Sequence, residues 1–258
     1  MDVTILSLTS LILCASFFIA GMMDAICGGG GLISMPVFLA SGFPVHYISG
    51  TSQCANCPGS FMAFAKYAKS GKIQWSSAVF AVPTAILGSL IGARFNVCLS
   101  AKILEMVMII LVPIVAIIML CNKELGREDC SGQFRKGQLF LRSALLGLGV
   151  GMYHGFYAAG AGMFYMLAFV LIDKLDLTVS SGNTKLVVVF SNIAATVTYA
   201  LSGVIIWKFA LVAMLFTISG NYLGAKLAVT KGETIIRPMF FVVIFILLVT
   251  ILGKLIVK

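Results

Sequence analysis

The sequence predicts an all-α polytopic membrane protein, built from two inverted structural repeats with broken or re-entrant helices at the midplane of the bilayer. Three observations lead to this class: the composition, a pair of glycine-rich breaks in apolar sequence, and an internal repeat. Of the 258 residues, 60% are hydrophobic and 10% are charged, and the mean hydropathy is +1.07. Because soluble domains carry about 25% charged residues, the chain has the composition of a protein embedded in lipid.

Ten apolar runs follow one another along the chain, and a helical span needs about 20 residues. We therefore expect about 8–10 embedded segments. The runs cover residues 4–26, 32–41, 50–68, 76–94, 103–121, 139–157, 163–172, 183–202, 207–226 and 238–257. Two of them, 32–41 and 163–172, have only about half the length of a span, and both follow a glycine cluster.

The first glycine cluster, Gly28-Gly29-Gly30-Gly31, predicts a break in a helix. Glycine costs about 1 kcal/mol per helical position relative to alanine. Backbone freed at bilayer depth must be buried in protein or line a cavity. The alternative is close helix packing through small residues, but four consecutive glycines exceed what such packing needs. The cluster therefore indicates a cavity or buried site.

An internal repeat relates the two halves of the chain. With a constant offset of 132 positions, Tyr67–Trp75 matches Tyr199–Trp207 at six of nine positions. The same offset places Gly50-Thr51-Ser52 over Gly182-Asn183-Thr184. The repeat predicts that both halves have the same fold.

The repeat also sets the predicted organisation of the chain. Residues 1–121 form a first membrane repeat, residues 122–138 a cytoplasmic linker with the densest charge, and residues 139–258 a second membrane repeat. An offset two residues shorter brings Asp24 onto His154.

The basic residues predict the orientation, because positively charged loops face the cytoplasm. Eleven basic residues would lie on one face and five on the other. The larger group comprises Lys66, Lys69, Lys72, Lys123, Arg127, Arg135, Lys136, Arg142, Lys226, Lys231 and Arg237, and the smaller group Arg94, Lys102, Lys208, Lys254 and Lys258. The N-terminus then lies outside the cytoplasmic (inner or plasma) membrane and the linker inside, so the halves are inverted. Such repeats commonly enclose a substrate site near the midplane.

An anion in such a site needs converging N–H and O–H donors that bind it reversibly. Lys185 is the cation best placed to balance an anionic load. For the hydroxyls, ordinary helix capping is an alternative that is compatible with anion binding. The candidate substrate-binding residues are Gly29, Gly30, Gly31, Gly50, Thr51, Ser52, Gln53, Asn56, Gly182, Asn183, Thr184, Lys185 and Asn192.

Three further acidic or basic positions have predicted roles. Asp24 and His154 could carry a proton that couples transport to a gradient, since ionisable residues at membrane depth are functional candidates. The alternative is that Asp24 lies near water at a helix end and His154 bonds a neighbour. Asp173, in the turn after the second short run, is expected to be solvated.

These features resemble the TauE/SafE sulfite-exporter family of membrane anion transporters. The resemblance rests on Gly28-Gly29-Gly30-Gly31 with Pro36 shortly after, on Gly50-Thr51-Ser52, and on the second copy at Gly182-Asn183-Thr184. It implies transport of small sulfur-containing anions such as sulfite or organosulfonates. The second half departs from the pattern, because Leu167 stands where Pro36 would repeat.

The resulting hypothesis is a secondary transporter, an exporter of small sulfur-containing anions. An anion channel and a transporter of a non-sulfur organic anion remain alternatives. An enzyme is disfavoured, since no His-Glu-x-x-His or Gly-x-Ser-x-Gly motif occurs. No metal and no cofactor are expected, and Cys54 and Cys57 are interpreted as packing residues. The expected partners are a small anion and the lipid bilayer, with a homo-oligomer left open and no nucleic acid.

Overall fold

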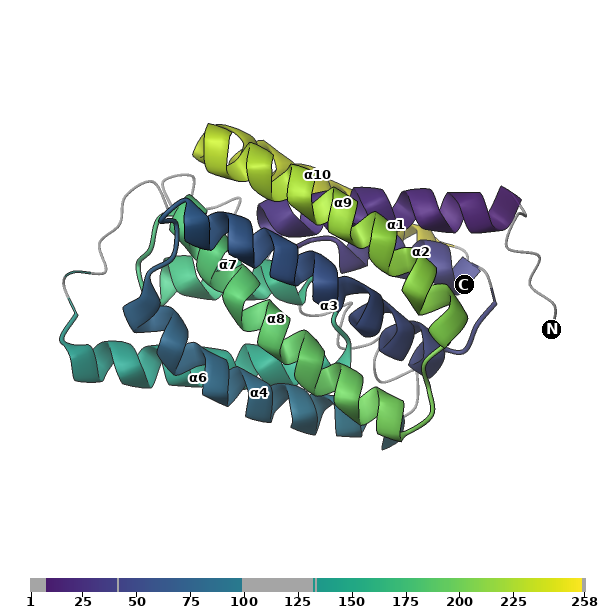
Figure 1. Cartoon of the computed structure of the whole chain (residues 1–258), viewed down its shortest axis with the longest axis horizontal. Coiled ribbons are helices and arrows are strands. Elements are labelled where there is room, and N and C mark those ends of the chain that lie inside the picture. The colour runs from purple at the N-terminus through teal and green to yellow at the C-terminus, as the bar shows by residue number, and fades with distance from the viewer. Residues whose placement is uncertain (1–7, 41, 99–131, 133, 257–258) are drawn as a thin grey trace.

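The computed structural model describes residues 8–40, 42–98, 132 and 134–256, and within these ranges every regular element is a helix (Figure 1). The elements are α1 (Leu8–Cys27), α2 (Gly31–Ala40), α3 (Val45–Lys69), α4 (Trp75–Cys98), α6 (Lys136–Phe156), α7 (Ala161–Leu171), α8 (Leu177–Leu201), α9 (Trp207–Lys231) and α10 (Glu233–Ile256). They follow the predicted apolar runs in order. The run 103–121 and most of the linker 122–138 lie outside the described residues.

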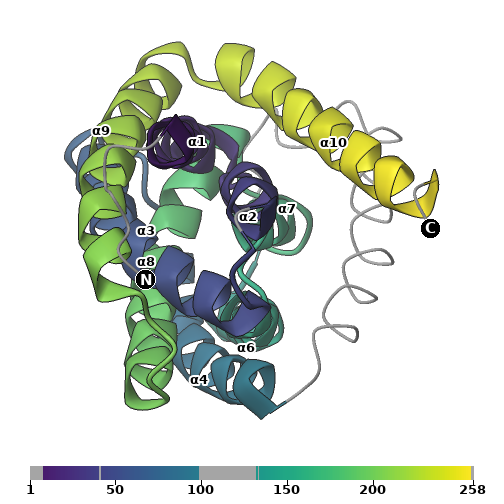
Figure 2. The same cartoon turned by 90° about the vertical axis from the view of Figure 1, so that its right-hand side faces the viewer.

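Helices α3 and α8 pack against each other at the centre of the bundle (Figure 1). Helix α9 packs on α3 and α1, while α4 packs on α8 and α6. Helix α10 runs along the outside of the bundle and contacts α1 (Figure 2). The two short helices, α2 and α7, lie on opposite sides of the middle of the bundle (Figure 1).

The surface of this bundle is apolar, as expected for contact with lipid. Large side chains such as Leu201, Leu215 and Phe245 are exposed at 84%, 65% and 67% of their area. Among the described residues, α4, α8 and α9 are long and apolar enough to cross a membrane. Helix α3 is equally long, but its buried face carries the polar run Ser49–Gln53. The protein is therefore an integral membrane protein with a polar interior.

The predicted breaks separate α1 from α2 and α6 from α7. Gly28 has φ +77° and its N–H donates to the Asp24 carbonyl, which ends α1. In the second break, Ala158 and Gly160 have φ values of 64° and 75°. Positive φ is unfavourable for residues with a Cβ, and the second break, which has fewer glycines than the first, includes one left-handed alanine.

The two breaks contact each other backbone to backbone. A Cβ on Gly28 would lie 2.2 Å from the carbonyl carbon of Gly162, and one on Gly31 would lie 2.9 Å from the Cα of Ala159. Side chains at these positions would push the breaks apart. Glycine at both breaks therefore brings the first residues of α2 and α7 together near the bundle centre.

Glycines also allow close helix crossings on both flanks of the bundle. A Cβ on Gly92 of α4 would lie 1.9 Å from the Met152 carbonyl oxygen of α6. A Cβ on Gly224 of α9 would lie 2.3 Å from the Met22 carbonyl oxygen of α1. Association of helices in lipid depends on such close packing, since lipid supplies little hydrophobic driving force.

We predict that Gly92→Ala destabilises the protein, because the added methyl group would collide with backbone rather than with a flexible side chain. Overpacking of this kind costs about 1–3 kcal/mol. Gly149→Ala in α6 is the matched control, since no described residue lies within 4 Å of a Cβ there. Thermal unfolding in detergent should show a lower midpoint for Gly92→Ala only. Equal midpoints would show that this crossing is loose.

Candidate functional site

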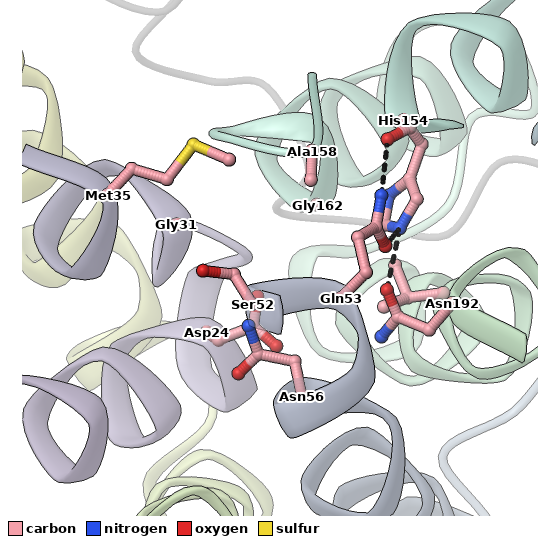
Figure 3. A pocket seen from close by; sticks show the side chains of 11 residues that line it. Asp24, Gly31, Met35, Ser52, Gln53, Asn56, His154, Ala158, Gly162 and Asn192 are labelled. Carbon is pink, nitrogen blue, oxygen red and sulfur yellow. Dashed lines mark hydrogen bonds between the residues drawn. The ribbon is translucent and has the colours of Figure 1, made fainter. Parts of the chain in front are cut away.

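A small cavity lies where the two helix breaks face α3 and α8 (Figure 3). Its volume is about 30 Å³, room for a water molecule or two. The lining residues come from both halves of the chain: Asp24, Gly31, Met35, Ser52, Gln53, Asn56, His154, Ala158, Gly162, Val188 and Asn192. The cavity therefore depends on how the two halves are packed together.

Helix α3 supplies three polar side chains to the cavity: Ser52, Gln53 and Asn56. The Ser52 side chain is buried at 3% exposure, and its hydroxyl has no hydrogen-bond partner among the described residues. A buried polar group without a partner is costly. The Ser52 hydroxyl is thus available to a ligand or a water in the cavity.

His154 is held by two amides. Gln53 donates from Nε2 to the His154 carbonyl oxygen at 2.8 Å. The His154 Nε2 lies 3.1 Å from Gln53 Oε1 and 2.8 Å from Asn192 Oδ1 (Figure 3). With the amides oriented in this way, Nε2 faces two acceptors and carries the proton. Asn192 in turn donates from Nδ2 to the Ser60 hydroxyl at 3.2 Å, which links α8 to α3.

Asp24 and Lys185 form an ion pair behind this network. The Lys185 Nζ lies 2.7 Å from the Asp24 Oδ2, and the two side chains are 1% and 14% exposed, respectively. Asp24 lines the cavity, whereas Lys185 is not among the lining residues. Removing one partner of a buried ion pair leaves the other charge uncompensated and is strongly destabilising. Lys185 therefore needs an anionic partner in every state of the protein.

Thr51 and Asn183 bind backbone instead of facing the cavity. The Ile206 N–H at the start of α9 donates to the Thr51 hydroxyl at 3.0 Å. The Gln74 N–H at the start of α4 donates to Asn183 Oδ1 at 2.9 Å, and Asn183 Nδ2 donates to the Gln74 carbonyl at 3.3 Å. In this structure, both residues act as helix caps supplied by a neighbouring helix.

Four of the five remaining candidates are glycines that serve close packing. A Cβ on Gly50 would lie 2.5 Å from the Val204 carbonyl oxygen, and one on Gly182 would lie 1.9 Å from the Lys72 carbonyl oxygen. Gly29 and Gly30 likewise lie against neighbouring side chains and backbone. The fifth candidate, Thr184, is buried, has no hydrogen-bond partner in the described part of the chain and does not line the cavity.

The structure thus brings part of the predicted site together. Gly31, Ser52, Gln53, Asn56, Asn192, Asp24 and His154 line the cavity. Lys185 reaches the cavity only through Asp24. Sequence reasoning missed Met35 and Val188, because apolar residues in apolar runs carry no signal of a site. It also missed Ala158 and Gly162, which lie between the runs 139–157 and 163–172 in the second break. Ser60 could have been found, since the repeat offset places it over Asn192.

The expectation that Asp173 is solvated was wrong. Its side chain is fully buried in the turn between α7 and α8. The hydroxyls of Ser77 and Ser143 donate to its Oδ2, the latter at 2.8 Å. Burial raises the pKa of the Asp173 carboxyl, although these hydroxyls and the Arg142 guanidinium oppose the shift. Asp173 therefore fastens the end of α7 to α4 and α6.

Comparison with known proteins agrees with a transport function. "Probable membrane transporter protein YfcA" of Escherichia coli (strain K12) is 32% identical over 238 residues, which cover 90% of this chain and 87% of that protein. A "Probable membrane transporter protein" of Haemophilus influenzae is 31% identical over 249 residues, with 96% and 95% coverage. "Probable membrane transporter protein ORF9" of a Sinorhizobium species is 28% identical over 236 residues. No solved structure matches this chain.

The helical bundle, its apolar surface and these relatives define a membrane transporter. Residues 13–251 match the family described as "Sulfite exporter TauE/SafE". The chain belongs to this family, as the glycine cluster and the repeated turns had indicated.

We predict that Thr51→Val lowers stability, because it leaves the part-buried Ile206 N–H without its acceptor, at a cost of about 1 kcal/mol or somewhat more. Thr51→Ser keeps the hydroxyl and is the matched control. The measurement is the thermal unfolding midpoint of the purified protein. If Thr51→Val kept the midpoint of the unaltered protein but lost transport, the hydroxyl would belong to the substrate site rather than to the cap.

Proposed function

We propose that this protein is a secondary transporter that exports small sulfur-containing anions, such as sulfite or organosulfonates, across the cytoplasmic membrane. The observation that carries this proposal is the central cavity, where uncharged donors from both halves meet two helix breaks. No catalytic step is part of it. The bilayer and the anion are the proposed partners, and the N-terminus is proposed to lie outside.

The donors at the cavity suit an oxyanion that must also leave. The Ser52 hydroxyl and the Asn56 amide line the cavity beside Gly31, the first residue of α2. Backbone N–H groups at a helix start favour negative charge. Such groups bind an anion without the persistent attraction of a fixed cation at contact distance. Family membership supports a sulfur-containing anion, since the family is described as sulfite exporters.

We further propose that the two halves are inverted repeats, and pairs of equivalent contacts support this. The Tyr67 hydroxyl donates to the Ala25 carbonyl at 2.9 Å, and the Tyr199 hydroxyl donates to the Gly155 carbonyl at 2.8 Å. Tyr67 and Tyr199 are 132 positions apart, and the two carbonyls are 130 apart. The caps at Thr51 and Asn183 obey the same offset, as do their partners Ile206 and Gln74.

One contact marks the axis that would relate the two halves. Ser60 and Asn192 are 132 positions apart, so they are equivalent in the repeat, and they hydrogen-bond each other at 3.2 Å. Equivalent residues meet only near the axis that exchanges them. Asn192 also lines the cavity, so the proposed substrate site lies beside this axis, where alternating access requires it.

The cavity in this conformation is too small for a sulfite-sized anion, which exceeds a water molecule or two in volume. Loading therefore requires movement of the helices around the breaks. We propose that the structure represents a closed conformation.

The test of the proposed function is flux into proteoliposomes with sulfite, thiosulfate, organosulfonates, sulfate and carboxylates, with and without a pH gradient. We expect saturable flux and counter-flow for the sulfur-containing anions. Flux without counter-flow would indicate an anion channel instead. Faster carboxylate flux would indicate a transporter of non-sulfur organic anions.

We predict that Ser52→Ala raises the KM for the transported anion roughly 10- to 100-fold, since a hydrogen bond to a charged group contributes about 1.5–3 kcal/mol. Ser219→Ala, at an exposed serine of α9 that bonds only its own helix, is the control and should behave like the unaltered protein. Flux measured over a range of anion concentrations gives the KM of each variant. An unchanged KM in Ser52→Ala would remove this hydroxyl from the site.

A further inference from the structure

We propose that the Asp24 carboxylate pairs with Lys185 while no substrate is bound, and that a substrate anion takes the place of this carboxylate as Asp24 takes up a proton. This inference rests on the proposed function and specifies how the transported charge is balanced. One proton and one anion would bind together.

The first support is the position of the ion pair relative to the cavity. Asp24 contributes to the cavity wall and Lys185 does not. The Asp24 side chain is the more accessible partner, at 14% exposure against 1% for Lys185. Asp24 therefore stands between the cavity and the buried ammonium group. An entering anion meets the carboxylate first and is repelled by it while it is charged.

The second support is the balance of charge. Among the described lining residues no lysine or arginine occurs, and Lys185 is the cation paired with one of them, Asp24. With Asp24 charged, the pair has no net charge. With Asp24 protonated, Lys185 is an uncompensated buried cation, and an anion that binds beside it restores neutrality. The empty and the loaded site then carry the same net charge, which avoids burying an unpaired charge in either state.

The titratable groups that surround Asp24 do not replace it as the residue that exchanges a carboxylate for a substrate anion. Lys185 of α8, Tyr67 of α3, His154 of α6 and Cys27 of its own helix lie close enough to interact with it electrostatically. Helix α2 carries no titratable side chain. Tyr165 of α7 bonds Ser191.

Among the side chains that the structure describes, the two outer helices that contact α1 place no titratable group against Asp24. The titratable side chains of α9 are exposed, and Arg237 of α10 pairs with Glu233. Asp24 is therefore the acid whose protonation decides whether the charge of Lys185 is compensated.

The other half of the chain offers a comparison. His154 takes the place of Asp24 in the repeat, and Gln53 takes the place of Lys185. These two also contact each other, but through amide hydrogen bonds. The same arrangement thus occurs once with two charges and once without a fixed charge. Only the charged copy can exchange one anion for another.

The experiment measures binding of an organosulfonate, a probe that keeps its charge over the working pH range, to the full chain in detergent or nanodiscs. In the unaltered protein we expect the affinity to fall by about tenfold per pH unit once the carboxyl has lost its proton, as linkage of one proton to one anion requires. A weakly buffered sample should take up about one proton per anion bound. Asp24→Asn should bind about tenfold more tightly or better at pH 8 and lose the pH dependence.

Two control variants separate Asp24 from other titrating groups. Asp173→Asn makes the same change at a buried carboxyl outside the cavity and should keep the pH dependence of the unaltered protein. His154→Gln should also keep it, whatever its effect on affinity. If the dependence persisted in Asp24→Asn and disappeared in His154→Gln, the histidine would carry the proton and the proposal would be wrong.

The experiment distinguishes failure of the Asp24–Lys185 exchange from failure of the proposed transport function. Binding of the organosulfonate with no pH dependence and no proton uptake would overturn the exchange but leave anion transport standing. Absence of binding or flux with every anion of the panel would overturn the proposed function itself. If Asp24→Asn does not fold, proton uptake by His154→Gln decides the question: uptake of about one proton per anion supports the exchange at Asp24, and its loss overturns it.

Discussion

The structure depends on the contact between two interrupted helices at the centre of the bundle. Gly28 and Gly162 approach so closely that neither position has room for a side chain. This contact fixes where α2 and α7 begin and leaves the cavity between them and α3. In lipid, freed backbone is tolerated only against protein or a cavity, so the breaks are stable because each one covers the other.

The polar interior follows from the same constraint. Tyr67 and Tyr199 donate to carbonyls near the ends of α1 and α6, while Thr51 and Asn183 bind the first N–H groups of α9 and α4. These polar side chains satisfy backbone groups at helix ends, so they are not available to a ligand. The Ser52 hydroxyl lines the cavity without such a partner. A donor that the fold leaves unused is the better candidate for a ligand.

The sequence predicted the helices and the breaks well because hydropathy and glycine clusters report directly on lipid and on helix ends. It predicted the site only in part. The repeat showed that Thr51 and Asn183 are equivalent, but periodicity does not reveal which neighbour a side chain reaches, and both are caps here. Asp173 was misjudged for a related reason, since the contact of α4 with α6 that buries it is not visible from a polar turn.

The proposed inverted repeats and the positions of the buried charged side chains concern different properties of transport. A duplicated scaffold allows the halves to exchange conformations around a shared axis, which moves a site between the two sides of a membrane. Such an exchange of conformations does not by itself select for the charge of the transported solute. Selectivity for charge must come from positions where the halves differ, and the Asp24–Lys185 pair opposite His154 and Gln53 is such a position. Symmetric packing would thus account for how a solute crosses, and the Asp24–Lys185 pair supports the proposal that this solute is an anion.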